Sequence, residues 1–379
     1  MLNANEQKVL ELIQQNPFIT QNEMAEAINI SRSTVASTIA SLTQKKHLLG
    51  RAYIINEESK VYCIGAMNVD RKYYLQDEMV LGTSNPVTSS VSVGGVARNV
   101  AENLGRLEFD VSLISLAGHD QDFQIVKKET EAYVNMQNVT QKNGMATGAY
   151  NAIIDPQGEM QMAIADMQIY DGMNVDWISS YFNQLREAEL IVLDLNLPYE
   201  VVEYILSIAR QFKVDLFVIP VSGPKMNRLP NDLKGVTWLI VNQDESETFF
   251  EVSCEHDGDF ERLIERWLEV GVENVVITRG SKASLYGNQQ GKRYAFNPPR
   301  VEQVIDVTGA GDSYAAGIIY GHLKKVEPIE AIHFGMTNSY YTIQSSATVR
   351  TELSKEKLEE EKNNLFKKPA IKMSRNNLN

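Results

Sequence analysis

IDVTGAGDSYAAG, residues 305–317, carries the most chemical information in the chain. Its small residues let backbone approach a ligand closely, and an apolar helix, roughly 313–324, follows at once. Because the first turn of a helix has unpaired N–H groups and the positive end of its dipole, we expect the 309–312 amides to bind an anion. The carboxylate of Asp312 lies beside these donors. An anion hole next to a base is the arrangement that phosphoryl transfer to an alcohol requires.

Two other kinds of glycine-rich phosphate loop do not fit. The chain has no GxxxxGK[ST] sequence, which excludes a P-loop. A GxGxxG dinucleotide fingerprint would need a sixth-position glycine where Tyr314 stands, and it would open an early strand-turn-helix unit rather than lie late in the chain.

Short apolar runs alternate with amphipathic helical stretches upstream of this loop. This alternation predicts a doubly wound α/β domain with a mainly parallel sheet over residues 60–350. The expected strands are VYCIGAM (61–67), VSLISLA (111–117), LIVLDL (190–195), LFVIP (216–220), TWLIV (237–241) and NVVITR (274–279). A polar, partly strand-like segment at 72–93 is expected to form a small β lid. Residues 351–379 are expected to be a charged C-terminal tail, in which SKEKLEEEKNN (354–364) forms a short helix.

The first sixty residues have a different pattern. Apolar spacing predicts a helix over residues 5–15, which Asn16-Pro17 ends. Thr20 and Glu23 form a capping box for a second helix, and Ser31 caps a third. A small β-wing is expected over 48–55.

This order of elements resembles the winged helix-turn-helix of bacterial regulators, and we expect it over residues 1–58. The resemblance implies that the third helix enters the DNA major groove. The expected DNA contacts are Arg32, Ser33, Thr34, Ser37 and Thr38 on that helix, and Lys45, Lys46 and Arg51 on the phosphate backbone. One departure is His47, where a glycine commonly follows the basic pair. The alternative is a three-helix domain that serves only for dimerisation.

Composition limits the other classes of protein. The 379 residues have a net charge of −13, but residues 1–60 hold six basic and six acidic residues, so the excess lies elsewhere. Between Glu26 and Glu57 there are four bases and no acid, which leaves a local field that can attract phosphate. Two distant cysteines, Cys63 and Cys254, exclude a disulfide scaffold. The polar start and the lack of a long apolar run predict a cytoplasmic protein without membrane association.

Two motifs together resemble the ribokinase-like (PfkB) carbohydrate and nucleoside kinases. DVTGAGDSYAAG is similar to their second signature, and Gly94-Gly95-Val96-Ala97-Arg98-Asn99 to the first. The resemblance implies a catalytic base, Asp312, and an anion hole of Gly309, Ala310 and Gly311. It also implies an acceptor site made of Asn68, Asp70, Gly94, Gly95 and Asn99.

The same resemblance implies ATP and Mg²⁺ as cofactors. Asn242-Gln243-Asp244-Glu245 matches the family's NxxE, in which Asn242 serves the nucleotide phosphates and Glu245 the Mg²⁺, partly through water. Taken alone, NxxE could also be a plain helix start. Thr278 and Gly280 resemble the nucleotide loop TxGxxG, with Ala283 in place of its last glycine, and Gly311 would also contact ATP. Asp306, with the segment 345–348, resembles a monovalent-cation site, expected to hold K⁺.

Within the family, VGGVARNVAENLGRL and the segment 146–171 are most similar to pseudouridine kinases. The resemblance implies that 147–165 also belongs to the lid. That subgroup implies acceptor contacts from Asp166, Thr147 and Asn151, although Asp166 could instead be a helix cap. It implies transfer of the ATP γ-phosphoryl group to the 5′-hydroxyl of pseudouridine. We also expect a homodimer. Ile219 departs from the subgroup, because an aspartate usually precedes Pro-Val-Ser there. Two alternatives are a kinase for ribose or another nucleoside, and a regulator that only senses ligand.

Overall fold

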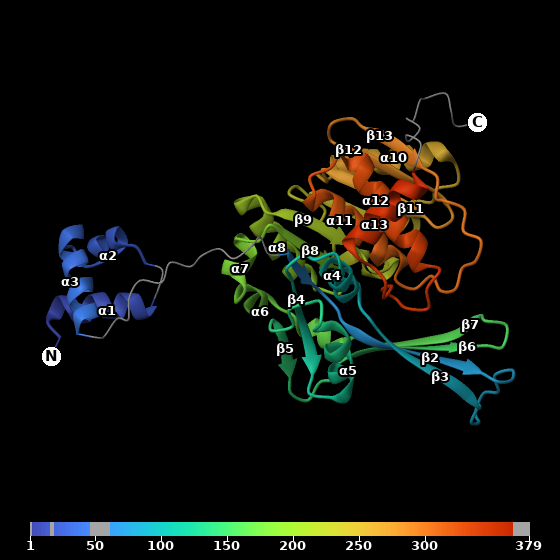
Figure 1. The fold of residues 1–379 in the computed structure, drawn as a ribbon, viewed down its shortest axis with the longest axis horizontal. Helices are drawn as coiled ribbons and strands as arrows, with labels where there is room; N and C mark the ends of the chain where they lie inside the picture. The colour runs from blue at the N-terminus through green and yellow to red at the C-terminus, as the bar shows by residue number, and fades with distance from the viewer. Residues whose placement is uncertain (1, 16–18, 46–60, 367–379) are drawn as a thin grey trace. The chain divides into compact units, whose positions relative to one another are not determined.

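The computed structural model describes residues 2–15, 19–45 and 61–366 (Figure 1). The chain forms two compact units, Met1–Glu57 and Glu58–Asn379, which are described separately. Lys46, Arg51, the expected wing at 48–55 and the end of the tail at 367–379 lie outside the described residues. In the described part of the chain, no helix is long and apolar enough to cross a membrane.

The N-terminal unit contains three helices, α1 (Ala4–Gln15), α2 (Gln21–Ala27) and α3 (Arg32–Gln44). Their apolar faces meet in one small core, with Val9, Met24, Val35 and Leu42 at its centre. The capping residues act as the sequence predicts. The Thr20 hydroxyl accepts a hydrogen bond from the amide of Glu23, whose carboxylate accepts one from the amide of Thr20. The Ser31 hydroxyl accepts from the amide of Thr34.

Thr38 and Lys45, two of the residues expected to contact DNA, make contacts within the N-terminal unit instead. Arg32, Ser33 and Ser37 are exposed on α3, and Thr34 is half-buried. Thr38 is buried and its hydroxyl donates to the carbonyl of Thr34, so the prediction that it faces outward is wrong. Lys45 forms an ion pair with Glu6 of α1 at 2.7 Å, which engages its ammonium within the unit.

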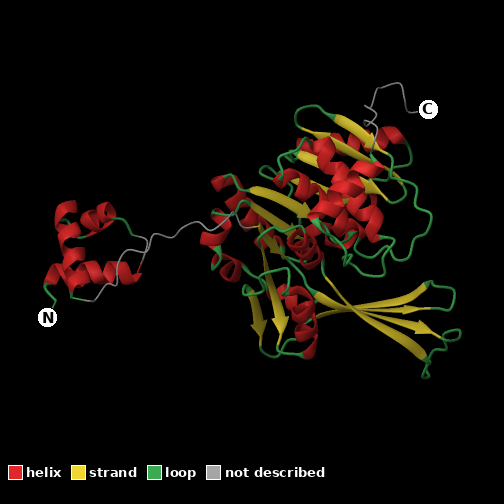
Figure 2. Cartoon of the chain, in the orientation of Figure 1, coloured by secondary structure: helices red, strands yellow, loops and turns green. Residues whose placement is uncertain are grey.

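The C-terminal unit is built on a nine-stranded sheet, and all six expected strands are confirmed (Figure 2). Its strand order is β13-β12-β11-β10-β9-β8-β1-β4-β5, and only the pairs β11–β12 and β12–β13 are antiparallel. The strands are β1 (Val61–Ile64), β4 (Val111–Gly118), β5 (Val139–Lys142), β8 (Leu190–Asp194), β9 (Asp215–Ile219), β10 (Trp238–Asn242), β11 (Asn274–Arg279), β12 (Lys282–Asn288) and β13 (Arg293–Phe296). Both faces of the central strands are buried, which explains their continuous apolar runs.

Helices bury the two faces of this sheet in separate cores. One core includes α8 and α10, and the other includes α4 and α11, so the architecture has three layers. The helices are α4 (Val96–Arg106), α5 (Gln121–Thr130), α6 (Val175–Ser179), α7 (Phe182–Arg186), α8 (Tyr199–Phe212), α9 (Gln243–Phe250), α10 (Asp257–Glu269), α11 (Ala310–Leu323), α12 (Pro328–Thr342) and α13 (Lys355–Leu365), with 3₁₀ turns at Gln168–Gly172 and Gly223–Arg228. The fold class expected from the sequence is thereby confirmed.

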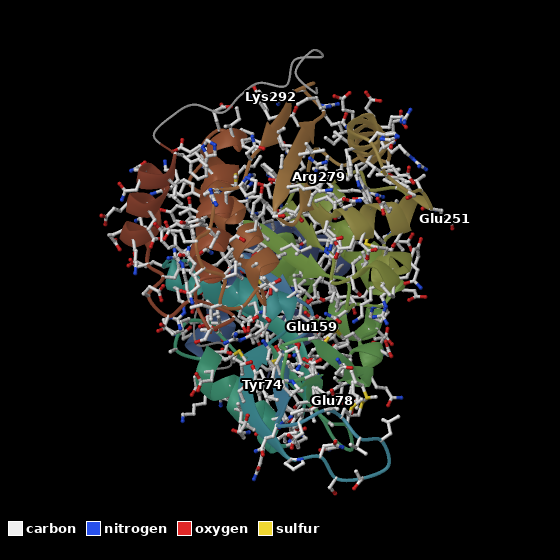
Figure 3. The ribbon with its side chains drawn as sticks, turned by 90° about the vertical axis from the view of Figure 1, so that its right-hand side faces the viewer. Tyr74, Glu78, Glu159, Glu251, Arg279 and Lys292 are labelled. Atoms are coloured by element: carbon white, nitrogen blue, oxygen red, sulfur yellow. The ribbon has the colours of Figure 1, made fainter. Side chains whose placement is uncertain are left out.

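A second, four-stranded sheet projects from the body of this unit, and we call it the small sheet (Figure 1). Its order is β3-β2-β6-β7, and it consists of β2 (Asn68–Leu75), β3 (Val87–Gly94), β6 (Gly148–Ile154) and β7 (Met160–Asp166). Figure 3 shows Tyr74, Glu78 and Glu159 grouped on this part, away from Arg279 on the body. Both segments expected to form a lid lie in or between these strands.

The short helix expected in the tail is confirmed as α13, but its packing was not expected. Helix α13 packs on the body, and the side chain of Leu358 is fully buried beside Tyr320 and Phe334. Arg350, which is also fully buried, forms an ion pair with Glu361 at 2.7 Å. A boundary at residue 350 therefore cuts through one packed region. The sequence does not indicate this packing, because α13 buries only a narrow stripe of side chains on a helix rich in charged residues.

Candidate active site

The glycine loop opens helix α11, as expected. Gly309 is the N-cap with φ +79°, and a Cβ there would lie 2.2 Å from the carbonyl oxygen of Thr348. Only glycine fits both the left-handed backbone and this close approach. The amide of Ala310 donates to the carbonyl of Val307 at 3.2 Å, so it is not a free member of the expected anion hole. Among the described backbone acceptors, none takes the amides of Gly311 and Asp312, which are left to bind an anion.

Asp312 lies in the first turn of α11, half-buried. Loss of solvent raises its pKa to about 6, and this effect outweighs the hydrogen bond that Asn99 donates to it. The Asn99 amide nitrogen lies 2.7 Å from the carboxylate, and the Asn99 oxygen accepts from buried Arg98 at 3.0 Å. Asn99 therefore orients the expected base, rather than only extending the acceptor site.

The pKa of Asp312 predicts how the rate depends on pH. A general base must be ionised, so kcat/KM for the acceptor should be constant at high pH and fall as the pH drops through about 6. Well below this value, we expect the loss to approach about tenfold per pH unit. A profile measured from pH 5 to 9 checks this. A rate that stays flat down to pH 5 would contradict the assignment.

The acceptor residues converge at the start of β2. Asn68 donates to Asp70 at 2.5 Å, and burial raises the pKa of Asp70 to about 6. A Cβ on Gly94 would lie 2.3 Å from the Asp70 carboxylate, so Gly94 makes room for it. Asp70 also raises the pKa of Asp312, which places the two carboxylates within electrostatic range. A polyol hydroxyl held by Asp70 can thus approach the base.

Gly95 has a separate structural role. Its φ is +99°, and a Cβ would lie 2.3 Å from the carbonyl oxygen of Ala66. The second glycine of the pair therefore lets helix α4 begin directly against the end of β1.

Three residues expected to contact the acceptor, Thr147, Asn151 and Asp166, do not converge with Asp70. The hydroxyl of Thr147 is buried, donates to Asp120 at 2.7 Å and accepts from the amide of Gly118, so it anchors β6. Paired residues of neighbouring strands share a face, and Asp70 pairs with Tyr150. Asn151 follows Tyr150, and Asp166 follows Ala165, the residue of β7 that pairs with Tyr150. Both therefore lie on the opposite face of the small sheet. Within one chain they therefore face away from Asp70.

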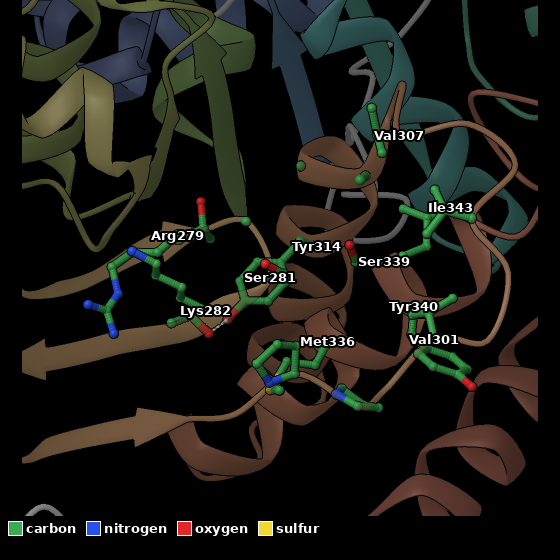
Figure 4. Close-up of a pocket in the computed structure, with 18 of the residues that line it drawn as sticks. Arg279, Ser281, Lys282, Val301, Val307, Tyr314, Met336, Ser339, Tyr340 and Ile343 are labelled. Carbon is green, nitrogen blue, oxygen red and sulfur yellow. Dashed lines mark hydrogen bonds between the residues drawn. The ribbon is translucent and has the colours of Figure 1, made fainter. Parts of the chain in front are cut away.

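A cavity of about 730 Å³ adjoins the other side of the glycine loop (Figure 4). Thr278, Gly280 and Gly311, which the sequence assigned to the nucleotide, all line it. Its remaining wall is largely apolar and includes Val301, Val307, Tyr314, Met336 and Ile343. An apolar slot that ends at free helix amides suits a planar base with a phosphate chain.

Asn242 and Glu245 form a reciprocal capping box at the start of α9, with both hydrogen bonds at 2.8 Å. NxxE is thus a helix start in this structure. Glu245 is also buried, and burial, Asp244 and Asp312 raise its pKa to about 7. A nearby cation would stabilise the ionised form of a buried carboxylate that lies close to other acids. Within the described residues, no three His, Cys, Asp or Glu side chains form a metal cluster, so phosphates and water would complete the Mg²⁺ shell.

Asp306 does not fit the expected monovalent-cation site. Lys72 of β2 forms an ion pair with one carboxylate oxygen, and the other oxygen accepts from the amide and hydroxyl of Thr308 at 2.9 and 2.7 Å. Burial alone would raise the pKa of Asp306, but Lys72 and Thr308 lower it. Both oxygens already have partners, and one partner is a cation. We therefore correct the expectation of bound K⁺.

Sequence reasoning also missed Asp194 at the end of β8. This buried carboxylate accepts from the amides of Ala66, Ala97 and Asn196 at 2.8–3.0 Å. It joins the ends of β1 and β8 to the first turn of α4, and burial raises its pKa. The available signal was an acid within the apolar run LIVLDL, which needs a buried polar partner.

A carboxylate base, free helix amides, an acceptor site and a nucleotide-sized cavity together define a kinase that phosphorylates an alcohol. The chain belongs to the pfkB family of carbohydrate kinases, whose family model matches residues 58–355. A winged helix-turn-helix DNA-binding model matches residues 2–45, so the N-terminal unit is of that type.

Individual relatives agree with this family. The uncharacterized sugar kinase YeiI of Escherichia coli is 28% identical over 324 residues, which cover 85% of this chain and 89% of that protein. The pseudouridine kinase of Escherichia coli is 28% identical over 301 residues, which cover 79% and 95%. Among solved structures, a carbohydrate kinase from Agrobacterium tumefaciens has a TM-score of 0.69 at 26% identity, covering 81% and 97%. The Arabidopsis thaliana ribokinase complexed with ribose and ATP has a TM-score of 0.73 at 17% identity, covering 81% and 99%, which shows the shared fold.

Proposed function

We propose that this kinase transfers the γ-phosphoryl group of ATP to the 5′-hydroxyl of pseudouridine, giving pseudouridine 5′-phosphate. The observation that carries the proposal is the convergence of Asp70 and the Asn99–Asp312 pair at the glycine loop beside the nucleotide-sized cavity. The similarity to the Escherichia coli pseudouridine kinase supports this acceptor. A guanosine-inosine kinase of Exiguobacterium acetylicum, 24% identical over 289 residues, supports the broader class of nucleoside acceptors.

Each part of the site has one task in this reaction. Asp70 and Asn68 hold the ribose hydroxyls, and Asn99 fixes the orientation of Asp312. Asp312 accepts the proton of the 5′-hydroxyl as the hydroxyl oxygen attacks the γ-phosphorus. The bond from this phosphorus to the β–γ bridging oxygen breaks, and ADP leaves. The amides of Gly311 and Asp312 donate to the oxygens of the moving phosphoryl group and stabilise their charge. Mg²⁺, held through Glu245 and the phosphates, would supply further neutralisation of that charge.

We propose that the small sheet acts as a lid over the acceptor and excludes water from it.

The face of the small sheet opposite Asp70 exposes four apolar side chains, Val87, Val91, Met162 and Ile164. A second copy of the chain would bury them. We therefore propose a homodimer. Light scattering should give twice the chain mass, and a monomer at micromolar concentration would contradict the dimer. The unpaired thiols of Cys63 and Cys254 support a cytoplasmic location.

An acceptor panel tests the substrate. Purified protein with ATP and Mg²⁺ is assayed for ADP release with pseudouridine, uridine, guanosine, inosine and ribose. We expect the highest kcat/KM with pseudouridine, by at least about tenfold, which corresponds to about 1.4 kcal/mol of differential transition-state binding. If uridine or ribose is the better acceptor, the pseudouridine assignment fails while the kinase assignment stands.

The winged-helix unit supports a second role, ligand-dependent binding of DNA. Exposed Arg32, Ser33 and Ser37 on α3 are suited to phosphate and base-edge contacts. We expect specific retention of DNA from the protein's own promoter, with Arg32→Ala weakening binding roughly 5- to 150-fold, as for one lost contact of about 1–3 kcal/mol. Glu11→Ala on α1 is the matched control. Equal affinity for promoter and random DNA, with or without pseudouridine, would favour a role in dimerisation alone.

A further inference from the structure

Lys72 connects the small sheet to the glycine loop. It stands on β2 at alternate positions with Asn68 and Asp70, so the three side chains share one face. Its ammonium forms an ion pair with Asp306 and lies 3.3 Å from the hydroxyl of Thr308. These partners are more than 230 residues away in sequence. The acceptor strand and the catalytic loop thus share one charge contact.

This contact lies at the point that fixes the path of the loop. Asp306 holds Thr308 through two hydrogen bonds, and the amide of Ile305 donates to the carbonyl of Ile343 at 2.8 Å. Thr308 directly precedes Gly309, the N-cap of α11. A shift of Asp306 would therefore move the amides that face the phosphoryl group.

The positive charge of Lys72 is electrostatically favourable at this point. Asp70 and Asp306 repel each other, and Lys72 offsets this repulsion for both carboxylates. Side-chain exposures of 22% for Lys72 and 27% for Asp306 show that the pair is largely shielded from solvent. Removal of the ammonium would leave both partly buried acids without the charge of Lys72, which favours their ionised forms.

We propose that Lys72 is a positioning residue whose tethered ammonium holds Asp306 in place of a monovalent metal ion. Because the same strand carries Asp70, the contact also couples acceptor binding to the geometry of the glycine loop. The inference rests on phosphoryl transfer at this site but not on which acceptor is used.

Monovalent-cation dependence tests this proposal directly. The rate of the wild type with its best acceptor should change less than about twofold when KCl replaces tetramethylammonium chloride at constant ionic strength. Lys72→Met should lower kcat roughly 10- to 100-fold, as expected for a misplacement of about 1 Å, with the KM for ATP little changed. Added K⁺ or NH₄⁺ should restore part of this rate. Lys72→Arg should keep most of the activity, and Lys127→Met, which changes an exposed side chain of α5, should behave as wild type.

Thermal unfolding gives a readout that needs no acceptor. K⁺ should raise the Tm of Lys72→Met but not that of the wild type, since only in the variant does Asp306 lack its ion-pair partner. A wild type that needs K⁺ for activity, or whose Tm rises specifically with K⁺, overturns the proposal even if the variant fails to fold. Full activity of Lys72→Met in tetramethylammonium chloride also overturns it. If no acceptor is phosphorylated, the proposed function fails and the Tm comparison still decides the role of Lys72.

Discussion

Asp312→Asn should reduce kcat by about 10²- to 10⁴-fold, the contribution of a well-placed general base. The amide has nearly the same shape as the carboxylate, and its oxygen can still accept the hydrogen bond that the Asn99 amide donates. It cannot accept a proton from the attacking hydroxyl. Steady-state rates of ADP release measure the loss, and calorimetry should show nucleoside affinity within about threefold of wild type, because Asp312 is expected to act mainly in the transition state.

The control for this variant is Asp176→Asn, which removes an exposed carboxylate on α6 and should leave the rate unchanged. An Asp312→Asn enzyme with wild-type turnover would refute the role of the base. A parallel loss of kcat and nucleoside affinity would instead assign Asp312 to acceptor binding.

Gly309→Ala should lower kcat by at least about 100-fold, as a displacement of about 1 Å at reacting groups does. The new Cβ would lie 2.2 Å from the carbonyl oxygen of Thr348, and backbone there has no flexible end that could move aside. Either the loop or the 345–348 segment must shift, and the amides of Gly311 and Asp312 shift with the loop. Initial rates at saturating ATP and acceptor measure this effect.

Gly291→Ala separates this clash from the cost of the backbone conformation. Gly291 has φ +80°, nearly that of Gly309, but its added Cβ meets no atom within 4 Å. Both variants should lose about 1–2 kcal/mol of folding free energy from the left-handed conformation, measured by urea unfolding. Only Gly309→Ala should lose activity. Similar activities for the two would show that close packing of the loop does not control catalysis.

Local sequence patterns predicted the framework well. The central strands are buried on both faces, so each appears as an apolar run, and the caps of α2 and α3 depend only on residues three apart. The glycine pair and the glycine loop were recognisable because close approach and positive φ leave few alternatives to glycine.

Contacts between distant segments could not be predicted in this way. Nothing in NVDRKYYL shows that Lys72 meets Asp306, and Thr147 gives no local sign that Asp120 uses its hydroxyl. Asn151 and Asp166 were assigned to the acceptor from resemblance, but strand register places them on the opposite face from Asp70. A shift of one residue reverses the face, and sequence patterns fix an element's kind better than its pairing.

The product of the reaction tests the central claim most directly. ATP, Mg²⁺ and pseudouridine are incubated with wild type and with Asp312→Asn, and the nucleoside fraction is analysed by mass and by ³¹P–¹H coupling. We expect wild type to form pseudouridine 5′-phosphate in equal amount to ADP, with phosphorus coupled to the two 5′ protons, and the variant to form almost none. ADP without phosphorylated nucleoside, or phosphate on a ring hydroxyl, would contradict the proposed reaction.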